Sequence, residues 1–300
     1  MLLSLLIPTY NRAEALRKLF ESIATESLAE SDLEVVVVDD GSTDETQSVE
    51  EEYSRFLKIK YSYQQNSGRA AALQKGLAQC EGKFVMLFDS DDYFLDGGLQ
   101  KIVHSLSALD VSGKVIGCCF NMIQQGDIKP PESIVASQLE SNFAHVSYDL
   151  GFNKDKKEVV LTEKLQEVFP PDLRGERRLP TSYLWDCLSL DNKVIFYSDV
   201  VGVKCYSPEG MTNNIDKLRF TSPKNSFLGY RKKCEIYPNA YTSRKVYFKA
   251  YINMCRYRFL IKERNDLPEL KGKLNPVLKG SFSLAGTMLA ICDRFRFRDL

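Results

Sequence analysis

The sequence lacks any run of about 18 apolar residues, so we expect no helix that crosses a membrane. Its apolar start, MLLSLLI, has no basic region before it and stops at Pro8, which predicts a first strand rather than a secretion signal. The eight cysteines show no CxxC spacing, so we expect reduced cytosolic thiols and neither a zinc site nor a disulfide framework. Histidine is scarce too: only His104 and His145 occur, and the helical pattern around His104 favours a packing or surface role over catalysis.

Charge is balanced in total but not along the chain. The 40 basic and 40 acidic residues give a formal net charge of zero. Residues 1–55 contain 13 acidic and 4 basic residues, whereas residues 241–300 contain 13 basic and 5 acidic ones. The neutral total therefore hides an acidic start and a basic tail.

Apolar runs of strand length alternate with helical periodicity in the first 125 residues. This alternation predicts an α/β fold whose mostly parallel sheet is covered by helices on both faces. The pairs Asn11 with Glu14 and Ser42 with Glu45 resemble capping boxes and predict two helix starts. Strands are expected at 2–7, 33–40, 58–63, 83–89 and 115–123, with helices beginning near Arg12, within 41–53 and 66–80, and around 99–106.

The rest of the chain is less regular. Residues 126–180 contain loop-like stretches such as KPPES and FPPDLRGERRLPTS, followed by a short helix in YLWDCLSL and strands in VIFYSDVVGVKCY. After Pro238 the chain becomes basic and helical. These changes in pattern predict three parts of the chain: residues 1–125, residues 126–238 and a helical tail at 239–300.

Three polar clusters follow predicted strands: PTYNR, DDGS and FDSDD. In sheets of this kind, ligands bind beyond the carboxyl ends of the strands. The carboxylates of FDSDD suit Mg²⁺ or Mn²⁺, which take protein carboxylates together with substrate phosphates. A solvated turn with an aspartate helix cap is the alternative, and the neighbouring polar ends favour the metal. Asp39 and Asp40 present a similar choice between helix capping and binding a ribose or base.

The stretches LLIPTYNRAEAL, VVVVDDGSTDET, NSGRAAALQKGL and GKFVMLFDSDD resemble, in this order and spacing, the family 2 glycosyltransferases of the GT-A fold. The resemblance covers roughly residues 3–110 and implies that Asp40 accepts the imino hydrogen of a uracil or thymine. It also implies that Asp91, with Asp89 and Asp92 beside it, holds a Mn²⁺ or Mg²⁺ ion that bridges the donor diphosphate. The nucleotide-sugar site implied in this way comprises Pro8, Thr9, Tyr10, Arg12, Asp40, Gly68, Arg69, Asp89, Ser90 and Asp91.

The resemblance further implies that residues 1–125 bind the nucleotide sugar and that residues 126–238 bind the acceptor. The implied reaction is inverting transfer of a sugar from a UDP- or dTDP-sugar to an acceptor hydroxyl. The family usually supplies its base from a Glu-Asp pair, but Thr181 and Ser182 stand at the corresponding place. Asp186 is the nearest carboxylate and our candidate base, with Glu176 as the second choice; an exposed helix residue is the alternative for Asp186. The segment CYSPEGMTNN resembles the family's donor-covering loop, with Ser207 and Glu209 where a histidine often stands. An ordinary surface loop is the alternative there.

The tail has a helical apolar stripe beside basic residues, which suits an anionic membrane surface. Packing against the protein's own helices is the alternative. We expect an enzyme on the cytoplasmic face of a bacterial membrane that extends a lipid-linked glycan for a surface polysaccharide, with no nucleic-acid partner. The alternatives are a degenerate scaffold subunit and a sugar nucleotidyltransferase; the lack of glycine in PTYNRAEA opposes the latter. The stripe comprises Leu284, Ala285, Met288, Leu289, Ile291, Cys292 and Phe295, flanked by Lys279, Arg294, Arg296 and Arg298.

Overall fold

A computed structural model describes residues 1–29, 31–127, 137–152, 155–173, 175–206, 215–261 and 276–297. The chain forms two compact units, which are described separately below. Unit 1 comprises Met1–Asn142, Phe152–Phe169 and Asp191–Ser207, and unit 2 comprises Phe143–Gly151, Pro170–Leu190 and Pro208–Leu300.

The described part of unit 1 is built on a nine-stranded sheet in the order β3-β2-β1-β4-β8-β6-β9-β5, with β7 also paired to β9. The first four strands along the chain are parallel, and every residue of β1 and β2 is buried, which explains their continuous apolar sequences. β8 runs antiparallel between β4 and β6. The strands are β1 (Leu3–Thr9), β2 (Leu33–Asp39), β3 (Ile59–Tyr63), β4 (Phe84–Leu87), β5 (Tyr93–Phe94), β6 (Val115–Gln124), β7 (Gln138–Ser141), β8 (Lys156–Leu161) and β9 (Lys193–Lys204).

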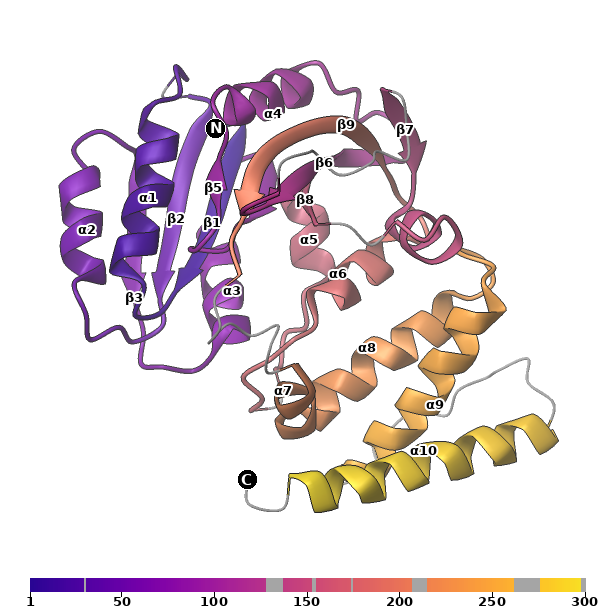
Figure 1. Ribbon diagram of the computed structural model, residues 1–300. Helices are drawn as coiled ribbons and strands as arrows, with labels where there is room; N and C mark the ends of the chain where they lie inside the picture. The colour runs from indigo at the N-terminus through magenta and orange to yellow at the C-terminus, as the bar shows by residue number, and fades with distance from the viewer. Residues whose placement is uncertain are drawn as a thin grey trace. The chain divides into compact units, whose positions relative to one another are not determined.

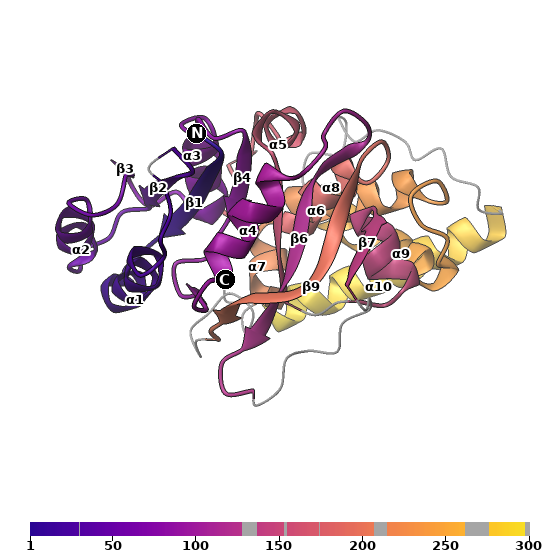
Figure 2. The ribbon, with the colours of Figure 1, turned by 90° about the horizontal axis from the view of Figure 1, so that it is seen from above.

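Helices cover both faces of this sheet, as predicted. Seen from above, α1 and α4 lie on one face and α3 and α5 on the other (Figure 2). Leu16, Leu19 and Phe20 of α1 are fully buried, as their spacing predicts. The helices are α1 (Ala13–Ala24), α2 (Thr46–Tyr53), α3 (Arg69–Leu77), α4 (Gly98–Ser107) and α5 (Thr162–Val168).

The two predicted capping boxes do not form. α1 begins at Ala13 and α2 at Thr46, and neither N-cap residue makes a side-chain capping bond. Asp44 instead caps both helices: one carboxylate oxygen accepts the N–H of Ala13 at 3.0 Å and the other accepts the N–H of Thr46 at 3.1 Å. A single carboxylate thus satisfies free N–H groups of two helices that are far apart in sequence.

The compact units do not follow the predicted boundaries at residues 125 and 238. β8 and β9 come from the middle third of the chain, but they complete the sheet by pairing with β4 and β6. The helical segments His145–Asp149 and Thr181–Leu188 belong to unit 2, whereas α5 belongs to unit 1. Local sequence pattern does not show which strands pair over long sequence distances, so the sequence-based boundaries differ from those of the compact units.

Unit 2 is helical. α8 packs on α9, and α9 packs on α10 (Figure 1). Aromatic rings fill the first of these contacts; Tyr230 and Tyr257 stack with ring centroids 5.6 Å apart. Gly286 permits the close approach of α10, because a Cβ there would lie 2.6 Å from the carbonyl oxygen of Ile252. The helices are the short turn η1 (His145–Asp149), α6 (Thr181–Leu188), α7 (Ile215–Thr221), α8 (Pro223–Ile236), α9 (Arg244–Leu260) and α10 (Pro276–Arg296).

The α/β architecture with C-terminal helices is confirmed. Within the described ranges, no helix combines the length and apolarity needed to cross a bilayer. The strand order 3-2-1-4 places β1 and β4 side by side, with β2 on the other side of β1. The boundary between β1 and β4 is a topological switch point, where α/β sheets bind ligands beyond the carboxyl ends of their strands.

Candidate functional site

The turns that follow β1 and β2 are joined by hydrogen bonds. Asn11 adopts a positive φ of 49°, its N–H donates to the hydroxyl of Ser42 at 2.8 Å, and its side-chain oxygen accepts the N–H of Thr43 at 2.8 Å. The carboxylate of Asp44 closes the same junction. The sequences PTYNR and DDGST therefore form one rigid element at the carboxyl edge of the sheet.

Asp40 joins a third segment to this edge. Its side chain is buried and accepts three hydrogen bonds of 2.8 Å, from the amide of Gln64 and the backbone N–H groups of Ser67 and Gly68. Gly68 has a φ of 93°, which favours glycine. Gly41 shows the same need, since it has a φ of 89° and a Cβ would lie 2.8 Å from the backbone nitrogen of Asn66.

Asp39 is held by protein groups alone. One carboxylate oxygen accepts the N–H of Ser42 at 2.7 Å, and the other accepts the hydroxyl of Tyr61 at 2.7 Å. Burial, together with the hydrogen bond to Asp39, raises the pKa of the Tyr61 hydroxyl, which keeps it protonated as a donor. Both oxygens of Asp39 thus accept hydrogen bonds that tie β2 to the turn at Ser42 and to β3.

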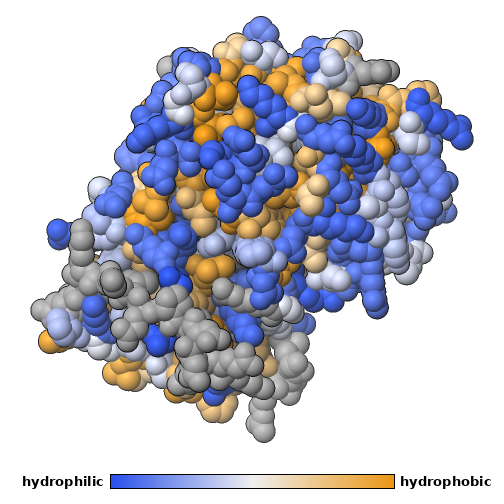
Figure 3. Space-filling model, turned by 180° about the vertical axis from the view of Figure 1, so that it is seen from behind, coloured by the Kyte–Doolittle hydropathy of each residue, from blue (hydrophilic) through white to orange (hydrophobic). Residues whose placement is uncertain are grey.

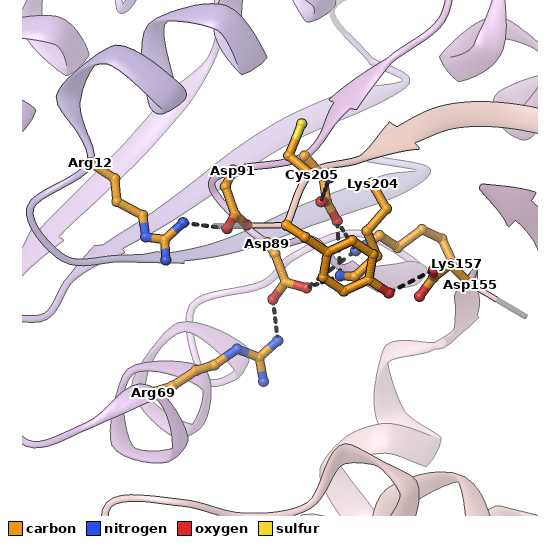
Figure 4. A network of polar contacts seen from close by, with 10 residues as sticks. Arg12, Arg69, Asp89, Asp91, Asp155, Lys157, Lys204 and Cys205 are labelled. Carbon is orange, nitrogen blue, oxygen red and sulfur yellow. Dashed lines mark hydrogen bonds and ion pairs between the residues drawn. The ribbon is translucent and has the colours of Figure 1, made fainter. Parts of the chain in front are cut away.

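The turn after β4 is built differently, because cations hold its carboxylates (Figure 4). Arg12, which precedes α1, pairs with Asp91, and Arg69, the first residue of α3, pairs with Asp89 at 2.6 Å. Lys204 at the end of β9 contacts Asp89 at 3.2 Å. Side chains from three separate elements thus meet at the DSDD segment.

Asp92 lies deeper than its neighbours. Its side chain has no exposed surface; one oxygen pairs with Lys157 of β8 at 2.8 Å, and the other accepts the N–H of Cys205 at 3.0 Å. Lys157 is itself only 6% exposed, so the two form a buried ion pair that fixes the turn against β8 and β9.

Asp89 remains ionised in this setting. Burial alone would raise its pKa, but the charges of Arg69, Lys157 and Lys204 outweigh burial and hold the pKa well below its usual range. The side chain still has 25% of its surface exposed, and that of Asp91 has 21%. Two charged carboxylates of this turn are therefore accessible from outside.

The remaining expected nucleotide contacts lie along the same edge. Pro8 is buried at the end of β1, beyond the stretch paired with β4, so its missing N–H costs no ladder bond. Tyr10 is 46% exposed, and Ser90 is buried within the DSDD turn. Thr9 carries a buried hydroxyl oxygen for which the described ranges supply no hydrogen-bond partner.

Two of the three expected metal ligands fit a divalent ion. Asp89 and Asp91 are accessible, ionisable and one residue apart, and Mg²⁺ or Mn²⁺ binds through one or two carboxylates plus substrate phosphates. Asp92 does not fit, because its oxygens are buried and bonded within the protein. Among the described side chains, no group of three or more histidine, cysteine, aspartate or glutamate residues could hold a metal by itself. A divalent ion at this turn would therefore also need ligands from substrate or water.

The two candidate bases lie in unit 2 with structural contacts of their own. Asp186 is buried and pairs with Lys233 at 2.9 Å and the hydroxyl of Tyr148 at 2.7 Å. Burial raises the pKa of Asp186, although Lys233 and Tyr148 oppose the shift. Glu176 accepts the N–H groups of Lys224 and Asn225, the contacts of a cap at the start of α8. Asp186 is therefore not an exposed helix residue, and that alternative is wrong. Ser207 and Glu209, in the segment that resembles a donor-covering loop, lie outside the described residues.

Sequence reasoning missed Lys157 and Lys204. The one available signal was their position, since Lys157 directly precedes the strand sequence EVVL and Lys204 directly follows VVGV. A lysine next to a buried strand needs a nearby anion. The sequence does not show that the anion is Asp89, which precedes these lysines by 68 and 115 residues.

Residues 4–151 match Glycosyl transferase family 2. This part of the chain belongs to that family. The resemblance carried by the four N-terminal motifs is therefore confirmed, and the polar edge described above lies within the family 2 region except for Lys157, Lys204 and Cys205.

Curated relatives match part of the chain. Over 95 residues, 31% of this chain, the sequence is 41% identical to the poly(ribitol-phosphate) beta-N-acetylglucosaminyltransferase TarS of Staphylococcus aureus. Over 121 residues, 39% of this chain, it is 38% identical to the GalNAc(5)-diNAcBac-PP-undecaprenol beta-1,3-glucosyltransferase of Campylobacter jejuni. These matches span 17% and 38% of the relatives' own length.

Solved structures extend the likeness to the whole chain. Residues 1–349 of S. aureus TarS in complex with UDP-GlcNAc align with 99% of this chain and 92% of that chain, with a TM-score of 0.65 and 19% identity. The mannosyltransferase PcManGT from Pyrobaculum calidifontis, in complex with GDP-Man and Mn²⁺, aligns with 97% of this chain and 87% of that chain, with a TM-score of 0.59 and 16% identity. At these identities the likeness shows the fold alone, and that fold is the expected GT-A fold.

Proposed function

We propose that the protein transfers a sugar, with inversion, from a nucleoside diphosphate sugar to an acceptor hydroxyl. The supporting observation is the polar edge of unit 1. There, Arg12–Asp91 and Arg69–Asp89 connect the segments after β1, β3 and β4, next to the buried Asp40. Cations and accessible carboxylates at a switch point suit a ligand that combines a diphosphate with polar rings.

The nucleoside end of the donor is assigned to the joined turns after β1 and β2. Tyr10 offers an exposed ring for stacking, and Asp40 accepts the imino hydrogen of a pyrimidine. The buried hydroxyl of Thr9 lies on the same edge and gains a partner if the base binds there. UDP-sugars come first and dTDP-sugars second, and the UDP-GlcNAc bound to TarS supports this order.

Asp89 and Asp91 are the residues that would hold Mn²⁺ or Mg²⁺. The ion would supply Lewis-acid stabilisation of the departing diphosphate. Asp91 carries one carboxylate oxygen that Arg12 does not engage, and Asp89 keeps its negative charge through its cationic neighbours. The protein's own part is to hold these two carboxylates charged, close together and accessible.

We propose Asp186 as the base that would deprotonate the acceptor hydroxyl. Its raised pKa fits a proton acceptor, and Lys233 and Tyr148 orient its two oxygens. Glu176 remains the second choice. Its capping bonds to α8 account for its position without a catalytic role.

The acceptor is proposed to be a lipid-linked glycan on the way to a surface polysaccharide. The support comes from the two relatives, one named for poly(ribitol-phosphate) and one for an undecaprenol diphosphate-linked glycan. Unit 2 contains 22 basic and 12 acidic residues, whereas unit 1 contains 18 and 28. A basic unit suits a negatively charged acceptor or surface.

Helix α10 is the proposed membrane contact. One side packs on α9, where Ala290 and Asp293 are buried. Large apolar residues are exposed on the helix, and orange side chains reach the surface along the lower edge of Figure 3, where α10 runs. Exposed apolar side chains next to Arg294 and Arg296 suit an anionic lipid surface. The exposed fractions are Val277 74%, Leu284 58%, Met288 58%, Leu289 42%, Ile291 42% and Phe295 75%.

Vesicle sedimentation tests this contact. We expect the protein to pellet with phosphatidylglycerol vesicles, and Phe295→Glu combined with Met288→Glu to abolish pelleting. Phe56→Glu is the matched control, because Phe56 in unit 1 is also 75% exposed. Equal loss in the control, or pelleting that does not depend on anionic lipid, would contradict the membrane role. A variant-sensitive dimer without vesicle binding would assign the stripe to self-association instead.

Release of nucleoside diphosphate tests the function itself. With Mn²⁺, we expect slow release of UDP or dTDP from one donor sugar by hydrolysis, and faster release by transfer when an acceptor is added. Asp91→Asn should release no measurable nucleoside diphosphate. Release of pyrophosphate from a nucleoside triphosphate and a sugar phosphate would favour the nucleotidyltransferase instead. Metal-dependent donor binding without turnover on any acceptor would favour the scaffold subunit.

A further inference from the structure

Among the described residues, the ion pairs around the DSDD turn leave Lys204 without a carboxylate of its own. Three carboxylates each have one short partner: Arg12 pairs with Asp91, Arg69 with Asp89 at 2.6 Å, and Lys157 with Asp92 at 2.8 Å. Lys204 is the fourth cation. It lies 3.2 Å from Asp89 and 3.5 Å from Asp92, so it shares two carboxylates that are already paired.

Two further acids, Asp155 and Glu158, act on Lys204 only through longer-range charge. Among the described residues neither makes an ion pair with Lys204, and the Asp155 carboxylate accepts the hydroxyl of Tyr206 at 2.8 Å. A cation with 21% of its side chain exposed and no anion of its own marks a place for an anionic ligand.

Lys204 is also the cation best able to change partner. Lys157 is 6% exposed and neutralises the fully buried Asp92, so its position is fixed by the fold. Lys204 has longer contacts and ends β9, at the rim of the site (Figure 4). A flexible ammonium on a long stem can move from a carboxylate to a phosphate oxygen without backbone movement.

We infer that Lys204 binds the diphosphate of the donor and neutralises it as it departs. This inference rests on the proposed function and adds a binding residue from outside the family 2 match. Asp89 and Asp91 would hold a divalent ion, which would supply Lewis-acid stabilisation of the leaving group. Lys204 would then contact the phosphate oxygens in place of Asp89 and neutralise part of their charge.

Isothermal titration of Lys204→Met tests the inference with three probes: UDP with Mn²⁺, uridine, and Mn²⁺ alone. Loss of one charged hydrogen bond should weaken UDP binding by about 10- to 100-fold. Uridine has no phosphate, so its affinity should stay the same. Mn²⁺ alone should bind more tightly to the variant, because a neighbouring positive charge has been removed. Lys204→Arg should restore UDP binding to within about threefold, since it keeps the charge.

The controls separate this inference from the proposed function. Lys164→Met removes an exposed lysine paired only with Glu167 and should leave all three affinities unchanged. If the wild-type protein does not bind UDP with Mn²⁺, the proposed function fails. If it binds but Lys204→Met binds equally well, or loses uridine as strongly as UDP, the role of Lys204 is wrong. Should the Met variant not fold, Lys204→Gln, which keeps a hydrogen-bonding head group beside Asp92, serves the same comparison.

Discussion

The acidic turns after β2 and β4 contain similar residues but hold them in different ways. Asp39 and Asp40 accept hydrogen bonds from uncharged N–H and O–H groups, and both are buried. Asp89 and Asp91 are paired with cations and remain partly exposed. Neutral hydrogen bonds fix a carboxylate permanently as part of the backbone scaffold, whereas an ion pair can be exchanged for a metal or a phosphate. The first turn therefore shapes the site, and the second carries its exchangeable charge.

The largest expected effect falls on the exchangeable turn. Asp91→Asn removes a proposed metal ligand while keeping the side-chain shape, so transfer should fall at least about 100-fold. Thermal stability should change little, because the partner Arg12 is 30% exposed and can be solvated. Initial rates and melting curves on the same preparations check both statements. A large loss of stability with activity retained would reverse the comparison between the two turns.

The buried ion pair between Lys233 and Asp186 in unit 2 should affect mainly the stability of the protein. Lys233→Met leaves Asp186, which is 2% exposed, without its cation, and should lower the free energy of unfolding by about 3–5 kcal/mol. Urea denaturation measures the loss. Adding Asp186→Asn to that variant should recover a large part of it, because no uncompensated charge is then buried.

The same pair of substitutions sharpens the assignment of the base. If the double variant folds well but does not transfer sugar, Asp186 is catalytic as proposed. If it folds well and keeps its activity, Asp186 is structural and the base lies elsewhere.

A substitution in the hydrogen-bonded turn after β2 should lower both the stability of the protein and its affinity for the nucleoside. Asp40→Asn turns an amide NH₂ group toward donors already in place, the N–H groups of Ser67 and Gly68, which should cost about 1–3 kcal/mol. Chemical denaturation and uridine titration check this. Asp191→Asn, an exposed change in the same unit, is the control and should stay within about 0.5 kcal/mol of wild type. Uridine binding at wild-type strength in Asp40→Asn would remove Asp40 from the site.

The smallest effect concerns the shared cap and depends on pH. Burial alone would raise the pKa of Asp44, but hydrogen bonds from Thr46 and Ala13 outweigh it and lower the pKa. Its stabilisation is therefore present above the unfolded pKa of about 3.9 and is lost as the pH falls through the lower folded value. Asp44→Ala should cost about 0.5–1 kcal/mol at pH 7, and the difference from wild type should shrink below about pH 4.

Glu45→Ala is the matched control for the cap. Glu45 stands at the N-cap position of α2 but makes no side-chain capping bond, so its removal should change stability by less than about 0.5 kcal/mol at any pH. If Glu45→Ala were as costly as Asp44→Ala, the sequence-based capping box would be the better description.

The parts of the fold that were predictable are those coded by local pattern. The runs LSLLIPT and LEVVVVD became fully buried parallel strands, and the spacing of Leu16, Leu19 and Phe20 placed α1 correctly. The capping boxes failed because Asp44, which lies inside the second motif, caps both helices in place of Asn11 and Ser42.

The site was half predictable for a related reason. Its carboxylates lie at strand ends that sequence can locate, but the cations opposite them come from elements up to 115 residues away. Asp92 looked like a third ligand because DSDD reads as one cluster, whereas the fold turns it inward to Lys157. Sequence predicted the anions of the network and missed the lysines, which only strand pairing brings to them.

The most direct test of the account is a crystal structure of the protein with UDP and Mn²⁺, with the ion located by its anomalous signal. The account predicts one ion about 2.1–2.2 Å from oxygens of Asp91 and the diphosphate. It also predicts that Asp92 stays paired with Lys157 and that the uracil lies beside Asp40. A diphosphate bound away from the DSDD turn, or an ion coordinated by Asp92 in place of Asp91, would contradict it.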